Sequence, residues 1–420
     1  MTNRQNNDNT ENFSESASDA EAKHIVNDEY ISYNGPRTKT EKDDKSIMDD
    51  VNDYVFTRHR KVRVTESGKG KKSVKRKKIT HRKKKMKRWK KVLIGIGCTL
   101  LSLIILIVGT FMFLVIKGGN ELLGGDFKIT APTGVEAQIQ DDGEYIVYKG
   151  RTYQLNKNIT SILFMGVDKR ELQTTEVNGT GGQADVLVLM AYDTKSGKIS
   201  MINISRDTMT DVTVYSANGG YVGSETQQIC LSYAYGDGKK TSCDNTVNSV
   251  KRLFYNIPIR SYLALDLDGI AAVNDSIGGV DVTSPETVGG FTAGQIYHLE
   301  GALSESFVRA RGHESADANT LRMQRQQIYA TEFMNKMISK TKQQITTPVD
   351  LFNASSPYTC TNLNPSKITY LAMSAVMSNG MSVEMKTVPG TAKMGKTYAE
   401  YYINEEQFFE LFLSVYYFPK

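Results

Sequence analysis

Hydrophobic residues are distributed unevenly along the chain, and the longest uninterrupted run covers residues 92–116. This run, VLIGIGCTLLSLIILIVGTFMFLVI, contains 25 residues and no charged side chain. At about 1.5 Å per residue, a helix of this length exceeds the roughly 30 Å hydrocarbon layer of a bilayer. A cleaved signal peptide would start near residue 1 and carry a shorter apolar region. The pattern therefore predicts a single transmembrane helix over residues 92–116 rather than a buried core helix.

Downstream of this run, short apolar segments alternate with amphipathic ones over residues 125–420. Continuous apolar runs bounded by polar turns are typical of buried strands. The predicted strands are EYIVYKGRTYQL (as a strand pair), SILFMGVD, DVLVLMAYD, KISMINISRD, YLALDLDG, GVDVT and SVEMKTVP. The predicted helices follow Thr241 and cover residues 320–341, 365–377 and 405–416. This interleaving predicts one α/β domain in which helices cover a sheet.

The charge of the chain divides into three unequal pieces around the apolar run. Residues 1–57 carry 6 basic and 13 acidic side chains, residues 58–91 carry 19 basic and one acidic, and residues 117–420 carry 27 basic and 32 acidic. Residues 1–57 are polar and poor in aliphatic side chains, so we expect a disordered tail that cannot fold alone. The composition as a whole excludes a disulfide-rich miniprotein and a collagen-like chain.

The basic juxtamembrane segment, residues 58–91, sets the expected orientation of the membrane helix. Lysine and arginine crowd this side of the apolar run, whereas the sequence GGNELLGGDFK on the other side is nearly neutral. The positive-inside rule then places the N-terminus in the cytoplasm and residues 117–420 outside the cell. Nucleic-acid-binding proteins also carry basic runs, but Trp89 is the only aromatic residue here that could stack on a base. Attraction to anionic membrane lipids is the favoured interpretation, and nucleic acid is not the expected partner.

The short turn at residues 194–197 joins two predicted strands, which should form an antiparallel hairpin. If residue 192 pairs with residue 199 beside the turn, the same register places Asp185 opposite Arg206 at the open end of the hairpin. If the strand that ends at Asp168 runs parallel beside KISMINISRD, Asp168 reaches the same edge, where open α/β sheets place ligands. Two acids and an arginine at one edge indicate a hard cation beside a phosphate. A solvated edge with an ordinary ion pair explains the pattern equally well.

A second candidate cluster comes from the segment FVRARGHESADANTLRMQRQQ, which contains four arginines. Arg309 and Arg311 are two residues apart and share one face if the chain is extended there. Arg322 and Gln326 are four apart on the predicted helix and share a face, with Arg325 next to them. Arg325 is offset from Arg322 by about 300° around the helix, so we expect it to face solvent or an acidic residue such as Glu332. Guanidinium groups bind phosphate oxygens in bidentate pairs, so the cluster indicates a phosphate site. A solvated basic face is the alternative.

The cysteines and histidines give little support for a metal or disulfide framework. Cys98 lies in the apolar run, so at most one pair can form among Cys230, Cys243 and Cys360, and Cys230–Cys243 is one candidate. The sequence contains no CxxC motif and no histidine cluster, so a zinc site is not expected. It also contains no GxSxG motif that would support a serine nucleophile.

Seven short motifs follow one another in the order found in the LytR–CpsA–Psr family. They are FMGVD, GGQADVLVLM, ISRDT, SYAYGDG, LDLDGIAAVNDSIGGVDV, VRAR and LRMQRQQ. The chain resembles this family over residues 125–420 and in its order of tail, single helix and outer domain. The resemblance implies an α/β/α sandwich with a central mixed sheet, outside a Gram-positive bacterial membrane. It also implies an enzyme that moves an anionic glycopolymer, such as a teichoic acid or capsular polymer, from a polyprenyl-pyrophosphate carrier to a peptidoglycan hydroxyl.

The resemblance implies a role for each residue that matches a family motif. The implied ligands of Mg²⁺ are Asp168 and Asp185. The implied pyrophosphate-binding residues are Arg206, Arg309, Arg311, Arg322 and Gln326. The implied catalytic residues are Arg206 and Asp207, where Asp207 either orients Arg206 or serves as a base. Magnesium and arginines would neutralise the charge that develops during attack on a pyrophosphate, and an apolar slot between sheet and helices would hold the polyprenyl chain.

This chain departs from the family pattern at three places. Gln183 and the following alanine stand where many members have arginine or asparagine and then serine. Gln228 and Cys230 stand where members often have lysine and asparagine, which removes one cation from the head-group pocket. Asn319 replaces an aspartate three positions before the helix arginine, and Asp317 is the acid nearby.

Two other functions stay open on the sequence alone. A non-catalytic polymer-binding or regulatory protein of the transcriptional-attenuator type would use the same arginines without turnover. A nucleic-acid-binding regulator would use residues 1–91. Polymer release in the presence of magnesium distinguishes the first alternative from an enzyme, and the salt dependence of binding to DNA and to anionic vesicles tests the second.

Overall fold

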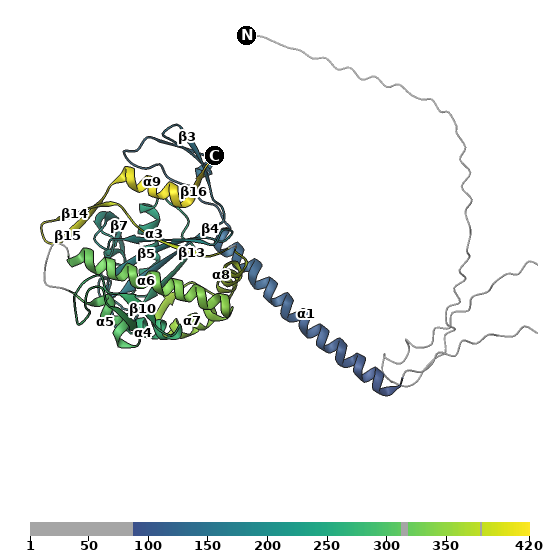
Figure 1. Cartoon of the computed structure of the whole chain (residues 1–420). Helices are drawn as coiled ribbons and strands as arrows, with labels where there is room; N and C mark the ends of the chain where they lie inside the picture. Colours follow the sequence, from purple (N-terminus) through teal and green to yellow (C-terminus); the bar gives the residue numbers. More distant parts are fainter. Residues whose placement is uncertain (1–86, 312–317, 379) are drawn as a thin grey trace, which may run out of the picture. The chain divides into compact units, whose positions relative to one another are not determined.

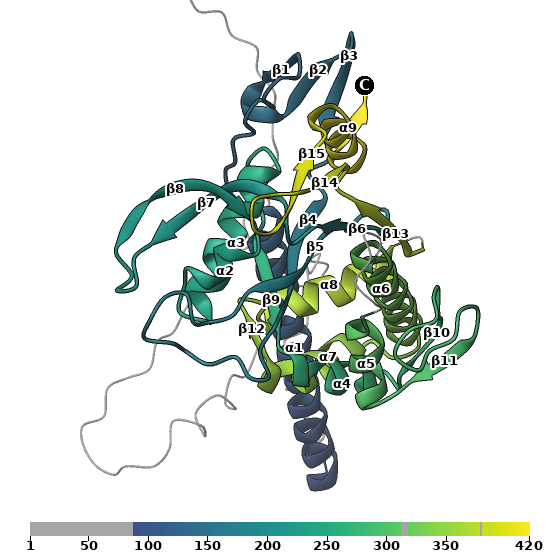
Figure 2. The ribbon, with the colours of Figure 1, turned by 90° about the vertical axis from the view of Figure 1, so that its left-hand side faces the viewer.

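A computed structural model describes residues 87–311, 318–378 and 380–420, and the structural statements below refer to these residues. The predicted tail at residues 1–57 and most of the basic segment 58–91 lie outside this part of the chain. Asp317 and the side chain of Asn319 lie outside it as well. Figures 1 and 2 show the described elements in two perpendicular views.

The domain is organised around a six-stranded mixed sheet within the described residues. Its strands, in spatial order, are β12 (Thr359–Thr361), β9 (Ser261–Leu265), β4 (Ile159–Val167), β5 (Ala184–Asp193), β6 (Lys198–Ile204) and β13 (Ser382–Thr387). The pairs β4–β9 and β6–β13 are parallel, and the pairs β12–β9, β4–β5 and β5–β6 are antiparallel. The predicted hairpin is confirmed in its register, since Tyr192 pairs with Ile199 and Leu187 pairs with Ile204.

The predicted neighbour of the first long strand was wrong. We expected β4 beside β6, but β5 lies between them and pairs with β4 along its whole length. The parallel neighbour of β4 is β9, which arrives much later in the sequence. Because β4 and β6 both run antiparallel to β5, their C-terminal ends still reach the same edge of the sheet. Asp168 therefore lies at the edge where the hairpin opens, as expected, although the strand order that places it there differs from the expected one.

Helices cover both faces of this sheet, which confirms the α/β/α sandwich. Strand β4 shows the alternation: Ile162 packs against Met334 and Ile338 of α6 (Ala318–Gln343), and its neighbour Leu163 packs in the core on the opposite face. The opposite face is covered by α3 (Lys240–Leu253) and α9 (Glu405–Tyr416), whose aromatic and aliphatic side chains form the larger core. Helix α8 (Pro365–Met377) joins α6 on its side through Leu371. The helices predicted at residues 365–377 and 405–416 have the observed bounds.

Smaller units surround the sandwich. An antiparallel sheet contains β1 (Ala137–Gln140), β2 (Tyr145–Tyr148), β3 (Arg151–Leu155) and β16 (Tyr417–Pro419). A third apolar cluster joins α4 (Leu267–Ser276), α5 (Ala302–Arg309) and α7 (Thr347–Ser355) with the pair β10 (Val280–Thr283) and β11 (Ile296–Leu299). The remaining elements are α2 (Leu231–Ala234) and two ribbons, β7 (Met209–Tyr215) with β8 (Tyr221–Gln228), and β14 (Gly390–Met394) with β15 (Ala399–Ile403). The ribbon β7–β8 projects from the body of the domain in Figure 2.

The apolar run lies within α1 (Arg88–Leu123), which is longer than the predicted span and is the one described helix long and apolar enough to cross a membrane. Its last turns contact the domain, and α1 leaves the domain beside α8 in Figure 1. Gly118 lies directly against the backbone of Ser366, where a β-carbon would collide. Glu121 accepts a hydrogen bond of 2.8 Å from the side chain of Asn364, and Thr160 of β4 donates one of 3.3 Å to the carbonyl of Leu122. The end of α1 is therefore fixed to the edge of the sheet where β4 begins.

The four cysteines are free thiols. The candidate pair Cys230–Cys243 is not formed: Cys230 lies at the sheet edge beside Arg206, and Cys243 is a buried residue of α3. The hydrogen-bond partner of the Cys243 thiol is Cys360 on β12.

Candidate functional site

The candidate site lies at the edge of the central sheet where β4 and β6 end and β5 begins. A β-bulge interrupts the pairing there, since Gly166 pairs with Val186 and Val167 pairs with Ala184. Asp185 is the extra residue on β5, and bulges of this kind commonly re-aim a side chain next to a functional site. The carboxylate of Asp185 forms an ion pair with the guanidinium group of Arg206, as the hairpin register predicted. Both side chains are about three-quarters buried.

Arg206 has three further neighbours, and sequence reasoning had assigned one of them, Asp207, to the site. Its Nη2 donates a hydrogen bond of 2.6 Å to Oε1 of Gln183 and lies 3.7 Å from Sγ of Cys230. Its Nε lies 3.6 Å from Oδ1 of Asp207. Burial raises the pKa of the Cys230 thiol to about 11, although Arg206 acts in the opposite direction. Gln183 and Cys230 thus hold Arg206 with neutral groups at two of the positions where the chain departs from the family pattern.

Asp207 is held by two ribbons. The side chain of Gln228, at the end of β8, donates hydrogen bonds to Oδ1 of Asp207 at 3.0 Å and to the carbonyl of Ala399 on β15 at 2.7 Å. The backbone N–H of Tyr401 donates to the carbonyl of Asp207 at 2.8 Å. Burial raises the pKa of Asp207, while Arg206 and Arg322 lower it. A carboxyl group with a raised pKa is better suited to accept a proton near neutral pH than an ordinary surface aspartate.

Asp168 lies at the end of β4, and its backbone N–H donates to the carbonyl of Gln183 at 3.2 Å. Its carboxylate is about half exposed and lies 3.9 Å from Nη2 of Arg309. Arg309 also forms an ion pair of 2.8 Å with Glu305, one turn earlier on α5. The condition under which Arg309 and Arg311 would share a strand face is not met, because α5 continues to Arg309. The helix forms there because it buries Phe307 and Val308 on its inner face.

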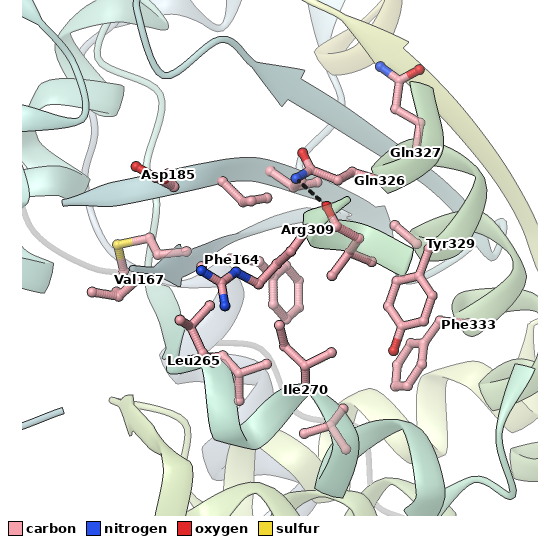
Figure 3. Close-up of a pocket in the computed structure, with 18 of the residues that line it drawn as sticks. Phe164, Val167, Asp185, Leu265, Ile270, Arg309, Gln326, Gln327, Tyr329 and Phe333 are labelled. Carbon is pink, nitrogen blue, oxygen red and sulfur yellow. Dashed lines mark hydrogen bonds between the residues drawn. The ribbon is translucent and has the colours of Figure 1, made fainter. Parts of the chain in front are cut away.

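Arg322 and Gln326 share one face of α6, as predicted, and both line the same cavity as Arg309 and Arg311. Burial, together with the nearby Arg311 and Arg206, lowers the pKa of Arg322. The Nε atom of Arg322 is buried and has no hydrogen-bond partner among the residues described. Nε2 of Gln326 donates a hydrogen bond of 3.2 Å to the carbonyl of Val308 (Figure 3). Arg322 is thus a cation in a cluster of like charges with an unsatisfied donor.

A cavity of about 610 Å³ runs from this charged cluster into the space between the sheet and α6. Its polar end contains Asp168, Asp185, Arg309, Arg311, Arg322 and Gln326. Its walls are mainly apolar and include Phe164, Val188, Leu265, Ile270, Phe333 and Met385. Figure 3 shows Arg309 reaching into the cavity between Val167 and Phe164. The volume is in the range of sites that enclose a drug-sized ligand.

Asp168 and Asp185 are the residues at this edge that could hold a divalent cation. No group of three or more His, Cys, Asp or Glu side chains with metal-binding geometry occurs in the described ranges. Magnesium often uses only one or two carboxylates and completes its coordination with water and substrate phosphates. Two carboxylates lining the end of the cavity where the arginines lie fit that requirement.

Arg325 faces an acidic residue, which is one of the two predicted environments, and does not face solvent, since only 1% of its surface is exposed. It forms an ion pair with Glu286, in the loop between β10 and β11. Helical periodicity gave the offset of Arg325 from Arg322, but it did not show that α5 and this loop cover the side of α6 on which Arg325 lies.

Comparisons with known proteins give a consistent result. The family model described as the LytR_cpsA_psr family matches residues 131–413. The chain is 28% identical over 232 residues to the polyisoprenyl-teichoic acid–peptidoglycan teichoic acid transferase TagU of Halalkalibacterium halodurans, covering 54% of this chain and 66% of that protein. It is 32% identical over 137 residues to the polyisoprenyl-teichoic acid–peptidoglycan teichoic acid transferase TagV of Bacillus subtilis, covering 33% of this chain and 31% of that protein.

The matched segments thus span less than two thirds of these curated relatives' length. Among solved structures, B. subtilis TagV superimposes with a TM-score of 0.47 at 22% identity, covering 62% of this chain and 97% of that one. The family model matches well over half of the 420 residues, in the part of the chain that carries the seven motifs. The protein therefore belongs to the LytR_cpsA_psr family.

Proposed function

We propose that this protein is a magnesium-dependent phosphotransferase that moves an anionic glycopolymer from a polyprenyl-pyrophosphate carrier to a peptidoglycan hydroxyl outside the cell. The observation that carries the proposal is the cluster of guanidinium groups around the unsatisfied donor of Arg322 at the mouth of an apolar cavity. The unsatisfied donor of Arg322 can bind an anion, and a pyrophosphate offers several oxygens to guanidinium forks. The names of the two relatives, as teichoic acid transferases, agree with this substrate class.

The apolar part of the cavity supports a lipid-linked donor rather than a free nucleotide or sugar phosphate. Its walls offer side chains such as Phe164, Ile270 and Phe333 and few polar groups beyond the charged end. Burial of hydrocarbon contributes about 25 cal/mol per Å², so several isoprene units in this space would add substantially to affinity. The pyrophosphate would then lie against Arg309, Arg311 and Arg322, with the glycopolymer directed outward.

The expected reaction is a displacement at the phosphorus atom that carries the glycopolymer. The oxygen of a peptidoglycan hydroxyl forms a bond to this phosphorus, and the bond from phosphorus to the bridging oxygen breaks, which releases polyprenyl monophosphate. Asp207 is placed to accept the hydroxyl proton, because its carboxylate is held by Gln228 and its pKa is raised. Arg206 would neutralise charge on the reacting phosphoryl oxygens, and Arg322 would do so on the leaving phosphate.

The metal requirement rests on the two carboxylates at this edge. When bound by Asp168 and Asp185, magnesium would supply positive charge to the pyrophosphate oxygens and orient them. Asp185 would in that case share its carboxylate between the cation and Arg206.

We further propose a single-pass topology with the N-terminus in the cytoplasm and the catalytic domain outside. The support is the charge asymmetry around the apolar part of α1, with the basic segment 58–91 on one side only. This segment would contact anionic lipids of the inner leaflet. The topology agrees with a peptidoglycan acceptor, which lies outside the membrane.

The test is reconstitution of the full-length protein in detergent with a polyprenyl-pyrophosphate-linked glycopolymer and a peptidoglycan acceptor. We expect covalent attachment of polymer to peptidoglycan and release of polyprenyl monophosphate, both dependent on magnesium. Tight binding of the donor without turnover would contradict the enzymatic proposal and favour a polymer-binding regulator.

A further inference from the structure

Arg325 is the largest fully buried side chain of the described residues, and the proposed mechanism does not use it. Its Nε donates a hydrogen bond of 3.2 Å to the carbonyl of Phe307, and its Nη2 donates to the carbonyl of Ala310. Its third nitrogen, Nη1, forms the ion pair with Glu286. All three nitrogens of the guanidinium group are therefore engaged, and two of them hold the backbone at the end of α5.

The backbone that Arg325 holds is the segment that carries Arg309 and leads into Arg311. The last carbonyls of a helix have no partner within the helix and must find one elsewhere. At the end of α5, Arg325 satisfies two of these carbonyls, and the neighbouring Gln326 satisfies a third, that of Val308. Two adjacent residues of α6 thus fix the direction in which α5 ends.

We propose that Arg325 is a positioning residue, which acts on the pyrophosphate donor through Arg309 and Arg311 by fixing the end of α5. This inference rests on the proposed function, since it presumes that Arg309 and Arg311 bind the donor. The side chain of Arg309 is about half exposed, and its 2.8 Å ion pair is with Glu305 of the same helix, so the pair moves with the end of α5. The position of its guanidinium group is therefore set mainly by the backbone from which it extends.

The buried ion pair gives this arrangement its rigidity. A fully buried guanidinium group needs a countercharge, and Glu286 supplies it from the loop that follows β10. Because the guanidinium group is planar, fixing one nitrogen on Glu286 also fixes the directions of the other two toward α5. A lysine in this place would keep the charge opposite Glu286 but could not span two carbonyls and a carboxylate in one plane.

The experiment compares donor affinity in the full-length protein for Arg325→Lys, for Arg309→Ala/Arg311→Ala, and for the triple combination. The ligand is a polyprenyl-pyrophosphate analogue at fixed magnesium, and thermal unfolding of each variant is measured in parallel. We expect Arg325→Lys to unfold cooperatively and to weaken binding by between about ten-fold and a hundred-fold, by analogy with the loss of about a hundred-fold in rate that a 1 Å displacement of a catalytic group can cause. In the Arg309→Ala/Arg311→Ala background, the same change should weaken binding by less than about two-fold, because its targets are absent.

Lys367 provides a matched control for a loss of stability alone. It is also a buried cation, and its Nζ donates to the carbonyls of Arg260 and Asn362 at 3.0 and 3.2 Å, at the opposite end of the sheet. Lys367→Met should lower the melting temperature while donor affinity stays within about two-fold of wild type, provided that stability and positioning are separate effects. If Lys367→Met weakens the donor as much as Arg325→Lys does, the positioning role is wrong.

Two further outcomes separate this inference from the proposed function. Wild-type donor affinity in a folded Arg325→Lys variant would overturn the positioning role and leave the proposed function intact. The same conclusion would follow if the loss of affinity in the triple variant equalled the product of the losses in Arg325→Lys and in Arg309→Ala/Arg311→Ala. Wild-type affinity in Arg309→Ala/Arg311→Ala would overturn the proposed donor site, and the positioning role with it.

Discussion

Replacing Arg322 with methionine is expected to stabilise the protein while it weakens donor binding. Arg322 is buried beside Arg311 and Arg206, and its Nε has no partner among the residues that the structure describes. Methionine keeps most of the apolar stem of the side chain but removes the charge and the unsatisfied donor. Arg322→Met should therefore raise the stability of the protein and lower its affinity for the donor. Replacing a residue with only a structural role would not change the two in opposite directions.

The magnitudes follow from the contacts. A buried donor without a partner costs about 1–3 kcal/mol, and we expect methionine to recover about 1 kcal/mol of this after some packing loss. For domains of 150–250 residues, that corresponds to a rise of about 2–4 °C in melting temperature. Loss of a charge-assisted contact to the pyrophosphate should cost about 2–5 kcal/mol of binding free energy. At about 1.4 kcal/mol per decade, donor affinity should fall about thirty-fold or more.

The assay uses the full-length protein in detergent, with thermal unfolding measured without ligand and with a polyprenyl-pyrophosphate analogue. Arg252→Met is the matched control, because Arg252 is an exposed arginine on α3 that donates to Thr213, away from the cavity. The control should change neither the melting temperature nor donor affinity beyond experimental scatter. A lower melting temperature for Arg322→Met together with unchanged donor affinity would refute the reasoning, because Arg322 would then be a structural residue.

Three other substitutions or measurements test the site. Asp168→Ala and Asp185→Ala should each abolish magnesium-dependent transfer. Asp168→Ala should lose little stability, because Asp168 is about half exposed. If either variant keeps near-normal activity, the replaced aspartate is not a metal ligand. Because burial raises the pKa of Asp207, the folded state binds a proton that the unfolded state has lost, so its contribution to stability falls as pH rises above the usual aspartate value. Asp207→Asn should therefore gain in melting temperature relative to wild type as pH rises above about 4 while it loses transfer activity, and a difference that stays constant with pH would contradict the raised pKa. With its pKa raised to about 11, the buried Cys230 thiol should resist alkylation at about pH 8 until denaturant is added, as judged by mass spectrometry.

The part of the site formed by neighbouring strands was predictable from the sequence. The pairing of Asp185 with Arg206 follows from the short turn at residues 194–197, because the register of a tight hairpin extends unchanged to its open end. The hairpin register could not give the parallel neighbour of β4, since β9 follows only after the hairpin β5–β6, the ribbon β7–β8 and the helices α2 and α3. That strand order is set by packing between elements that lie far apart in the sequence.

The arginine segment shows the limit of periodicity more sharply. Helical spacing correctly grouped Arg322 with Gln326 and gave the offset of Arg325 from Arg322. It could not reveal that α5 and the loop carrying Glu286 cover the other side of α6, which turns an expected surface residue into the most buried cation of the site. The contacts of Gln228 and Cys230 were also inaccessible to sequence reasoning, because both residues act across separate strands.

The attachment of α1 to one end of β4 has a consequence for how the lipid reaches the enzyme. Leu122 is hydrogen-bonded to Thr160, and Asp168 lies eight residues further along the strand. At about 3.3 Å per residue, the arginine cluster is roughly 25 Å from the point where α1 joins the domain. With α1 in a bilayer, a carrier whose pyrophosphate reaches Arg309 must withdraw its first isoprene units from the membrane. The cavity would then replace the bilayer as their solvent, so the enzyme would act as an extractor of its lipid substrate before any bond is broken.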